Sequence, residues 1–488
     1  MIQVEEAAVK SQEVFEQLSA YIKTMAEQAE EAHRVEQGIW DYVLKLGLVF
    51  LSEYFARVGD GDAGEQLRLC DGRFLPQDRK APHTKRYVSV FGPLEVKRMC
   101  YGEGKIEAVP LDAKLNLPKS EYSYLLQDWS QSFDVHDSFG ETVVKIEKLL
   151  HLGTSVRTLE NLNQDIAESV ENFQATHVLP EPLEEGALLV AAVDGKGVPL
   201  RREKSQKDTG RHRLRKGEKA NKKKIACVGT VYTIDRFPRK VEDVIDEVMH
   251  EQAQQRRPRP QHKHVQAHLI KGKEGTFSWI NEEIAARNPG GEKPVVFLGD
   301  GERAIWSAKE AYLQSSVEVV EVLDLFHVTE KLWLCAPCFH KEGSSQAEAF
   351  VEHRLRMLLQ GKVSGVISGL GQMATKHRLK GKEKKTLEQV TGYFRRNKKR
   401  MRYDQYLAEG YPIGSGVVEG ACRHLVKDRM ERTGMRWSLQ GAQAMLDLRA
   451  VYLNDEWEPF WEYHIHQQYE LLYAQIPQAN IISLPQAA

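Results

Sequence analysis

The feature of this chain that most constrains its fold is a series of four apolar runs between residues 187 and 333. They read ALLVAAVDGKGVPL from residue 187, KKIACVGTVYTID from 223, KPVVFLGDG from 293 and VEVVEVLDLFHV from 317. Each run is short and mostly apolar, and helical patterns separate them along the chain. Buried strands that alternate with helices are typical of a sheet covered by helices. We therefore predict a three-layer α/β domain.

A chain of 488 residues is too long for one hydrophobic core, so we expect several domains. Residues 334–410 turn helical and basic, which indicates an all-helical insertion that splits the α/β domain. The N-terminal helices are expected at 1–80, either for packing or for oligomerisation. The other expected boundaries are 81–185 for a mainly helical DNA-binding region with a β-hairpin, 186–333 for the first part of the core, 334–410 for the insertion, 411–455 for the core segment that carries Glu419, and 456–488 for a C-terminal tail.

The first sixty residues have the pattern of helices, and a hairpin pattern follows them. Within residues 1–58, apolar side chains recur three and four positions apart, which predicts two long helices. Residues 85–102, KRYVSVFGPLEVKRMCYG, alternate apolar and polar side chains around Gly92-Pro93 and predict a β-hairpin.

Residues 138–170 have the spacing of a helix-turn-helix. The pattern gives one helix, a turn that contains Gly153 and a second helix capped by Ser155. Arg157 and Asn161 then lie early on the second helix, where side chains meet base edges or phosphates. An ordinary pair of packed helices gives the same pattern, and that alternative stays open.

Positive charge is concentrated in a few segments although the net charge of the whole chain is −1. Residues 201–224 hold twelve Lys or Arg against three acids, and further basic clusters lie at 254–264, 376–385 and 394–402. A single run of this kind is usually a solvated loop. Four runs together favour a face for a polyanion, because neutralising phosphates releases counterions and dominates affinity for nucleic acid.

Three carboxylates form the candidate site. Asp194 and Asp300 each follow a predicted buried strand and precede a glycine, so we expect them at one edge of the sheet. Two such acids repel each other unless a cation lies between them, which suggests a divalent metal. An Asp-Gly pair at a strand end can also be only a turn.

The stretch IGSGVVEGACRHLVKDRM (413–430) supplies the third carboxylate, Glu419. If it is one helix, Glu419, Arg423 and Lys427 share a face, and a surface ladder of ion pairs is the plainest interpretation. The glycines that frame Ser415 instead favour a close approach of backbone or ligand. With Glu419 as third ligand, two Mg²⁺ ions would clamp a phosphodiester.

Several motifs together resemble a known family. VDGKGVPL, FLGDGERAIW, LDLFHVTEKLW, SGVVEGACRHLVKDRM and TGMRWSLQGAQAMLDLRA are similar to bacterial insertion-sequence transposases of the ISKra group, over residues 85–455. These are DDE enzymes with a ribonuclease-H-like core and are distantly Mutator-like. The resemblance implies that Asp194, Asp300 and Glu419 are the catalytic acids and metal ligands, with Glu431 or Glu409 as alternatives to Glu419.

The function implied by this resemblance is DNA transposition. It comprises binding to terminal inverted repeats, Mg²⁺-dependent strand cleavage with Mn²⁺ as a substitute, and strand transfer into target DNA by a two-metal mechanism. The expected partners are double-stranded DNA and further copies of the chain, as a homodimer or higher oligomer in the bacterial cytoplasm and nucleoid. A structure-specific nuclease of the same fold, and a non-catalytic DNA-binding protein derived from a transposase, are the alternatives.

Other residues have smaller predicted roles. Asp324 and His327 resemble the Asp-x-x-His element of Mutator-like relatives, which implies an accessory role. His327 would bond Asp324 or a phosphate, and a hydrogen-bonded core histidine is the alternative. Cys335, Cys338 and His340 have ligand-like spacing, but without a fourth ligand we expect two free thiols and no zinc site. The predicted DNA-binding residues are Arg157, Asn161, Arg211, Arg213, Arg215, Lys216, Arg423, Lys427, Arg432 and Arg436.

Overall fold

A computed structural model describes residues 2–176, 180, 185–201, 223–252, 255–313, 317–432 and 434–477. The chain divides into two compact units, of which the first joins residues 1–175 to residues 456–488 and the second spans residues 176–455. The C-terminal segment therefore belongs to the first unit, whereas the sequence suggested a separate tail. None of the described helices is both long enough and apolar enough to cross a membrane.

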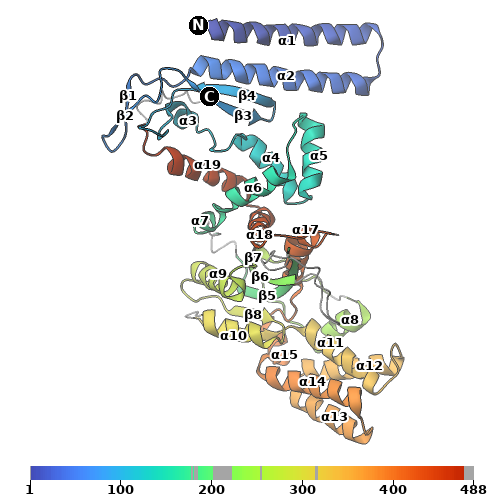
Figure 1. Ribbon diagram of the computed structural model, residues 1–488. Helices are drawn as coiled ribbons and strands as arrows, with labels where there is room; N and C mark the ends of the chain where they lie inside the picture. Colours follow the sequence, from blue (N-terminus) through green and yellow to red (C-terminus); the bar gives the residue numbers. More distant parts are fainter. Residues whose placement is uncertain are drawn as a thin grey trace, which may run out of the picture. The chain divides into compact units, whose positions relative to one another are not determined.

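The first unit begins with the two long helices that the sequence predicts. Helix α1 (Ile2–Glu27) and helix α2 (Ala32–Val58) run antiparallel and side by side (Figure 1). The Ser11 hydroxyl donates to Glu53 over 3.0 Å, and the rings of Tyr21 and Tyr42 lie 5.4 Å apart, so these residues mark the surface between the two helices.

The predicted hairpin and the predicted helix pair are both present in this unit. Strand β3 (His83–Ser89) pairs antiparallel with β4 (Gly92–Arg98). Ser138 caps α5 (Phe139–Leu150), and Ser155 caps α6 (Val156–Ala167) by accepting the N–H of Thr158. The remaining elements are β1 (Gln66–Arg68), β2 (Phe74–Pro76), α3 (Pro110–Lys114), α4 (Tyr124–Asp134), α7 (Val170–Gln174) and α19 (Trp457–Tyr473).

The core of the first unit combines segments that are far apart in the sequence. Leu44 of α2, Val88 of β3, Leu126 of α4 and Ile146 of α5 share one buried cluster. Helix α19 packs on α3 and α7, and its Trp457 donates to Asp128 over 2.8 Å. The C-terminal helix is therefore fixed to this unit by both apolar and polar contacts.

The second unit is built on a five-stranded mixed sheet, which confirms a mixed α/β fold class. The strand order is β7-β6-β5-β8-β9; β5 pairs antiparallel with β6 and parallel with β8, and β8 pairs parallel with β9. The bounds are β5 Leu188–Pro199, β6 Lys223–Ile234, β7 Gln261–His268, β8 Val295–Gly299 and β9 Val319–Leu323.

Strand β7 was not predicted, because its sequence QHKHVQAH is part of a basic, polar run. It is an edge strand that pairs with β6 alone, and mainly Val265, Gln266 and Ala267 are buried. The cluster at 254–264, interpreted from sequence as a nucleic-acid contact, thus partly forms the sheet edge.

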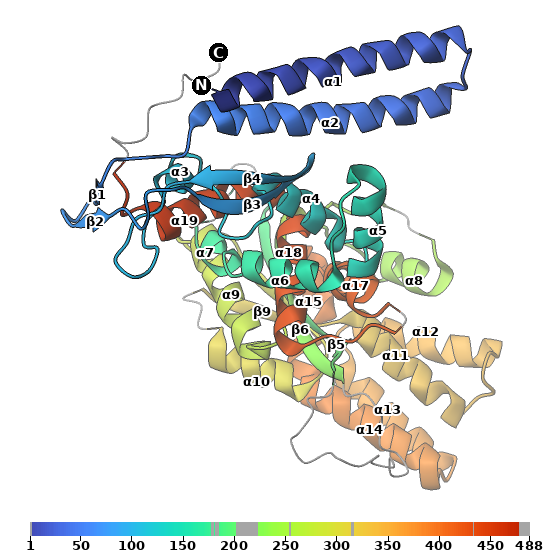
Figure 2. The same cartoon turned by 45° about the horizontal axis from the view of Figure 1, so that its top comes forward.

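Helices pack against this sheet and continue into a helical segment (Figure 2). Helix α9 packs on β5, β6 and β7, whereas α16 packs on β5 and β6 and α18 packs on β7. The helical insertion expected at 334–410 is present as helices without strands in its described residues. The bounds are α8 Val241–His250, α9 Gly272–Arg287, α10 Arg303–Tyr312, α11 Leu325–Cys335, η2 Ala336–Cys338, α12 Ser345–Leu359, α13 Val363–Lys376, α14 Gly381–Asn397, η3 Lys398–Arg400, α15 Tyr403–Glu409, α16 Gly416–Ala421, η4 Cys422–Lys427, α17 Asp428–Met430 and α18 Leu439–Leu453.

Candidate active site

Three aspartates lie in one row across the parallel strands β5, β8 and β9. Val193 pairs with Gly299, and Gly299 pairs with Leu323. The next residue on each strand is an aspartate, namely Asp194, Asp300 and Asp324. Because parallel strands in register present equivalent positions side by side, the three carboxylates converge at one edge of the sheet.

Asp194 differs from the sequence expectation in one respect. Strand β5 does not end there but continues to Pro199 in its antiparallel pairing with β6. Only the pairing with β8 stops at this level, because β8 ends at Gly299. Asp194 is therefore held in a continuous strand, which positions it more firmly than a turn would.

Asp324 is fully buried and all of its oxygens accept hydrogen bonds. It caps α11 by accepting the N–H groups of Phe326 and His327. Its Oδ2 lies 2.6 Å from Nδ1 of His327, and its Oδ1 accepts the backbone N–H of Ser415 over 3.1 Å. Both oxygens are thus engaged in holding neighbouring segments, which makes Asp324 a positioning residue more than a free ligand.

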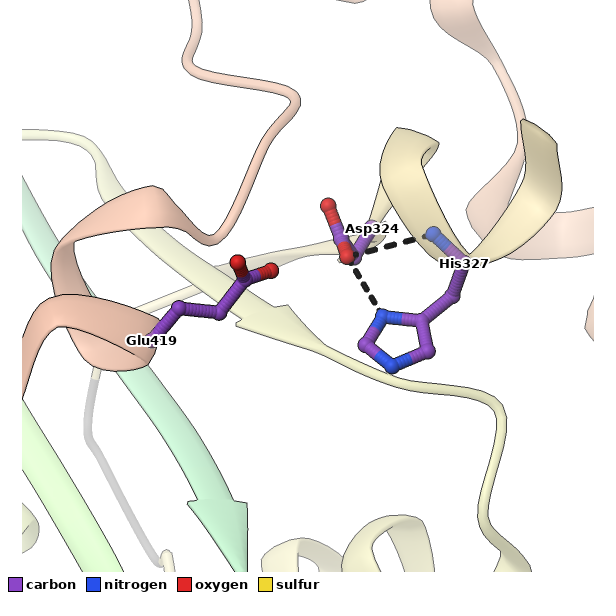
Figure 3. A group of neighbouring side chains, drawn as sticks. All are labelled: Asp324, His327 and Glu419. Atoms are coloured by element: carbon purple, nitrogen blue, oxygen red, sulfur yellow. Dashed lines mark hydrogen bonds and ion pairs between the residues drawn. The ribbon is translucent and has the colours of Figure 1, made fainter. Parts of the chain in front are cut away.

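Glu419 reaches the same place from helix α16 (Figure 3). The hydroxyl of Ser415 donates to Oε1 of Glu419 over 2.9 Å, one helical turn earlier in the chain. Ligand atoms of Asp324, His327 and Glu419 lie within 4.8 Å of one another. In the described part of the chain, no other group of three or more His, Cys, Asp or Glu side chains brings its ligand atoms this close together. Glu419 therefore lies beside Asp324, one of the three aspartates in the row.

The helix after Glu419 is not the continuous α-helix that the sequence suggested. Residues 422–427 form the π-helical turn η4 between α16 and α17. A π-helix has more residues per turn, so the spacing i, i+4, i+8 no longer places Glu419, Arg423 and Lys427 on one α-helical face. Arg423 is exposed, and its Nε lies 3.8 Å from Oδ1 of Asp428.

The electrostatics of the site show crowded negative charge beside one cationic ring. The hydrogen bond to Asp324 raises the pKa of His327 to about 9, against the opposing effect of burial. Burial raises the pKa of the Asp300 carboxyl; the N–H of Glu302 and the charge of His327 lower it, and the charges of Glu302 and Asp194 raise it. His327 is therefore a cation at neutral pH next to acids that repel one another.

A cleft of about 660 Å³ opens on this edge of the sheet. Its acidic and basic lining residues are Asp194, Glu247, Arg257, His327, Glu330 and Glu419. Asp300 is not part of the lining; its Oδ1 accepts the backbone N–H of Glu302 over 2.8 Å. Of the predicted set, Asp194 and Glu419 therefore line the cleft and Asp300 does not. The ligand atoms that lie within 4.8 Å of one another belong instead to Asp324, His327 and Glu419.

The two alternatives to Glu419 form ion pairs elsewhere in the unit. Glu409 pairs with Arg236 over 2.8 Å at the exposed end of α15. Glu431 pairs with Lys223 over 2.5 Å. Neither of these two residues lines the cleft, whereas Glu419 does.

The predicted thiols and cations are distributed as follows. Cys335 is buried and Cys338 is half-buried. Both are free thiols, and burial raises the pKa of each.

The residues predicted to bind DNA are exposed where the structure describes them. These are Arg157, Asn161, Arg423, Lys427, Arg432 and Arg436. Arg211, Arg213, Arg215 and Lys216 lie outside the described residues.

Sequence reasoning missed the supporting residues of the site. Ser415 is 5% exposed and connects Asp324 to Glu419, yet it was treated only as part of a glycine-rich entry. The signal available in the sequence was that Ser415 lies four residues before Glu419, the spacing at which two side chains on a helix meet. Cys422 was also missed: burial and then the adjacent Asp194 raise the pKa of its thiol.

Comparison with known proteins gives no family for this chain. No protein-family model matches the sequence, and no curated protein matches it. Among solved structures, the Drosophila P element transposase strand transfer complex is similar over 74% of this chain and 84% of that chain, at 10% sequence identity and a TM-score of 0.25. A TM-score this low does not establish a common fold.

Proposed function

We propose that this chain is the DNA transposase of an insertion sequence, with a ribonuclease-H-like core. In this proposal it binds terminal inverted repeats, cleaves DNA strands and joins their 3′-hydroxyls to target DNA. The observation that carries the proposal is the row of Asp194, Asp300 and Asp324 at the carboxyl edge of the sheet, met by Glu419 from a helix that follows a helical insertion. The sequence motifs named above support the same activity.

The donor set suits hard divalent cations. Asp194, Asp300 and Glu419 offer carboxylate oxygens, which are the ligands that Mg²⁺ and Mn²⁺ prefer. Burial, and to a smaller extent the charges of Glu302 and Asp194, raise the pKa of Asp300, so a bound cation would favour its ionised form. We assign two Mg²⁺ ions to these three residues; when bound, they supply the charge that activates a water or a 3′-hydroxyl and stabilises the leaving oxygen.

The chain's own residues then have separate tasks. Asp324 and Ser415 hold the α11 and α16 segments together, and Ser415 orients Glu419. His327 keeps a proton at neutral pH because Asp324 accepts from its Nδ1, so its other nitrogen can donate to a phosphate oxygen. Arg423, Lys427, Arg432 and Arg436 are exposed after Glu419 and are assigned to the phosphates of a bound DNA end.

We assign the oligomer contact to one face of the α1–α2 pair. Tyr21 of α1 and Tyr42 of α2 face each other across the pair. The next residue along each helix, Ile22 or Val43, is turned by about 100° around its helix axis. Because the helices run antiparallel, these two turns bring Ile22 and Val43 to the same side of the pair. The large apolar residues expected on that side are Phe15, Ile22, Val43, Phe50 and Tyr54, which are 39–54% exposed.

The size of this face fits a second copy of the chain. Helices of 26 and 27 residues are about 40 Å long and together about 20 Å wide, giving a footprint of roughly 800 Å². That is the area that each partner buries in a standard-size interface, about 800 Å². A homodimer through this face would provide one core for each of the two DNA ends.

The experiment that tests the function uses labelled duplex DNA that carries the terminal repeats from the genomic flanks of the coding sequence. The purified chain is incubated with Mg²⁺, Mn²⁺ or EDTA, and the products are resolved on a denaturing gel. We expect metal-dependent cleavage at the repeat boundary and joined products. Cleavage without joining would instead indicate a nuclease, and specific binding without cleavage in either metal would indicate a non-catalytic DNA-binding protein.

A further inference from the structure

A second pocket adjoins the acidic cleft in the same unit. It has a volume of about 240 Å³ and lies between the end of β6, helix α8, the start of α11 and the loop before α16. Four aromatic residues and two arginines stand out in its lining: Tyr232, Phe237, Phe326, Tyr411, Arg239 and Arg257. Most of its lining surface is apolar.

The pocket is built by close packing of the loop at residues 410–416 on the aromatic walls. Gly410 has a φ of +73°, and a Cβ there would lie 2.5 Å from the backbone nitrogen of Phe237. A Cβ on Gly414 would lie 2.9 Å from the ring of Phe326. Only glycine lets the backbone come this close to Phe237 and Phe326, so Gly410 and Gly414 shape this cavity.

The two arginines make the pocket attractive to a hydrogen-bond acceptor. The guanidinium of Arg239 lies 5.3 Å from the ring centre of Phe237, and its Nε is buried without a hydrogen-bond partner. Burial, and then the charge of Arg257, lower the pKa of Arg239 to about 10. Arg257 pairs with Glu247 over 2.5 Å, and no ion pair of Arg239 is present among the described residues. An unpaired buried donor of this kind is costly unless a ligand accepts from it.

The pocket also shares wall residues with the candidate active site. Phe326, Arg257 and Val248 line both the pocket and the acidic cleft. Phe326 lies between Asp324 and His327 in the sequence and is 41% exposed. A group in the pocket would therefore be next to whatever occupies the cleft.

We propose that this pocket holds the base of one nucleotide that is turned out of the DNA stack beside the cleavage site. A base offers flat faces for the aromatic walls and acceptors at its edge for Arg239. The small volume suits one base better than a larger ligand, since pockets for drug-sized molecules usually exceed about 300 Å³. The proposal rests on the proposed function only in taking DNA as the substrate.

The first test measures base binding without any cleavage. Deoxynucleoside monophosphates, and deoxyribose 5-phosphate as the probe without a base, are added to the full chain in EDTA, and saturation-transfer NMR reports contact with base protons. We expect base signals from the wild type and a loss of about tenfold in Phe237→Leu and Arg239→Gln. Tyr312→Leu is the matched control, because Tyr312 is an exposed aromatic on α10 outside the pocket. Absent base signals, equal signals in the pocket variants, or equal competition by deoxyribose 5-phosphate would overturn the proposal.

A second test distinguishes a base of the DNA from a free nucleotide. The adenine analogue 2-aminopurine is placed in turn at each position around the repeat boundary, and its fluorescence is followed on binding in EDTA. We expect a change at one position that is lost in Phe237→Leu and Arg239→Gln but kept in Tyr312→Leu. If monophosphates bind yet no DNA position responds, the pocket serves a free nucleotide and the proposal is wrong. Both tests are independent of strand cleavage, so their failure and the failure of the proposed function give different results.

Discussion

The backbone N–H of Ser415 donates to Oδ1 of Asp324 over 3.1 Å. This bond joins the end of β9 to the loop that leads into α16, two segments separated by 91 positions and by the helical insertion. The hydroxyl of Ser415 then reaches Oε1 of Glu419. This buried serine therefore links Glu419 to Asp324 directly, beside the backbone hydrogen bond from Leu325 to Ile413 that joins the same two segments.

Replacing this serine tests the connection. Ser415→Ala removes only the hydroxyl, because the bond to Asp324 uses the backbone. A hydrogen bond to a charged group is worth about 1.5–3 kcal/mol, so we expect strand cleavage to fall about tenfold or more with DNA binding unchanged. Ser344→Ala is the matched control, since Ser344 caps α12 and does not line the cleft. Equal cleavage rates in the two variants would show that Ser415 does not orient Glu419.

The carboxylates at the sheet edge should be essential for chemistry but not for binding. We expect Asp194→Asn and Glu419→Gln each to lower metal-dependent cleavage by about a thousandfold, because each removes a charge that holds the metal. Affinity for the terminal repeat should stay within about twofold, as measured by fluorescence anisotropy. Glu431→Gln is the control, since Glu431 pairs with Lys223 away from the cleft. A Glu419→Gln protein that still cuts would remove Glu419 from the site.

Much of the fold was predictable because burial imposes strong patterns. The apolar runs that became β5, β6, β8 and β9 are buried in the sheet, and the caps Ser138 and Ser155 are encoded within four residues. Strand β7 was missed because an edge strand in QHKHVQAH buries few side chains, so the polar sequence conceals its pairing with β6. The π-helical turn η4 was not predicted, because the spacing of apolar residues in this segment also fits an ordinary α-helix.

The site was predictable only as single residues. Asp194, Asp300 and Glu419 have local signals, namely glycine neighbours and nearby apolar runs. Their arrangement depends on the register of β5, β8 and β9, in which Val193, Gly299 and Leu323 align. Register is set by pairing between separate strands, and the β5 and β8 partners lie more than a hundred residues apart, so it is invisible in any one segment. The same reason explains why Asp324 was expected to be accessory and not the residue that links two segments.

The exposed cations after Glu419 should contribute to DNA affinity through phosphate contacts. We expect the double variant Arg423→Gln, Lys427→Gln to weaken binding to any duplex and to reduce the slope of log K against log salt by about two. Fluorescence anisotropy between low and moderate salt measures this slope. Lys23→Gln on α1 is the control for a general change of charge. A slope equal to that of the wild type would place these two residues away from the DNA.

His464 should make the stability of the first unit depend on pH. Its ring is 3% exposed, its Nδ1 lies 2.8 Å from Oγ of Ser169, and burial lowers its pKa from 6.5 to about 4. The unfolded chain therefore binds a proton between pH 6.5 and 4 that the folded chain does not, so stability is complete above pH 6.5 and falls as the pH drops through this window. The shift corresponds to about 3 kcal/mol in total.

Urea unfolding at several pH values measures this dependence. We expect His464→Gln to lower stability at neutral pH and to flatten its decline toward pH 4. His466→Gln, which changes an exposed histidine two residues away, should keep the wild-type slope. Parallel curves for His464→Gln and the wild type would mean that His464 is protonated in the folded state.

The apolar face of the α1–α2 pair should control the number of subunits. Phe15 and Phe50 are each more than half exposed, and a glutamate at either position would bury a charge if a second copy covers the face. We expect Phe15→Glu and Phe50→Glu to shift the light-scattering mass from twice 55.7 kDa to that of one chain, and to abolish joined products. Lys23→Glu is the control, because position 23 turns away from α2. Since the variants leave the sheet and its aspartates untouched, cutting of a single end should continue in the monomer, and a dimer that survives both changes would place the contact on another surface.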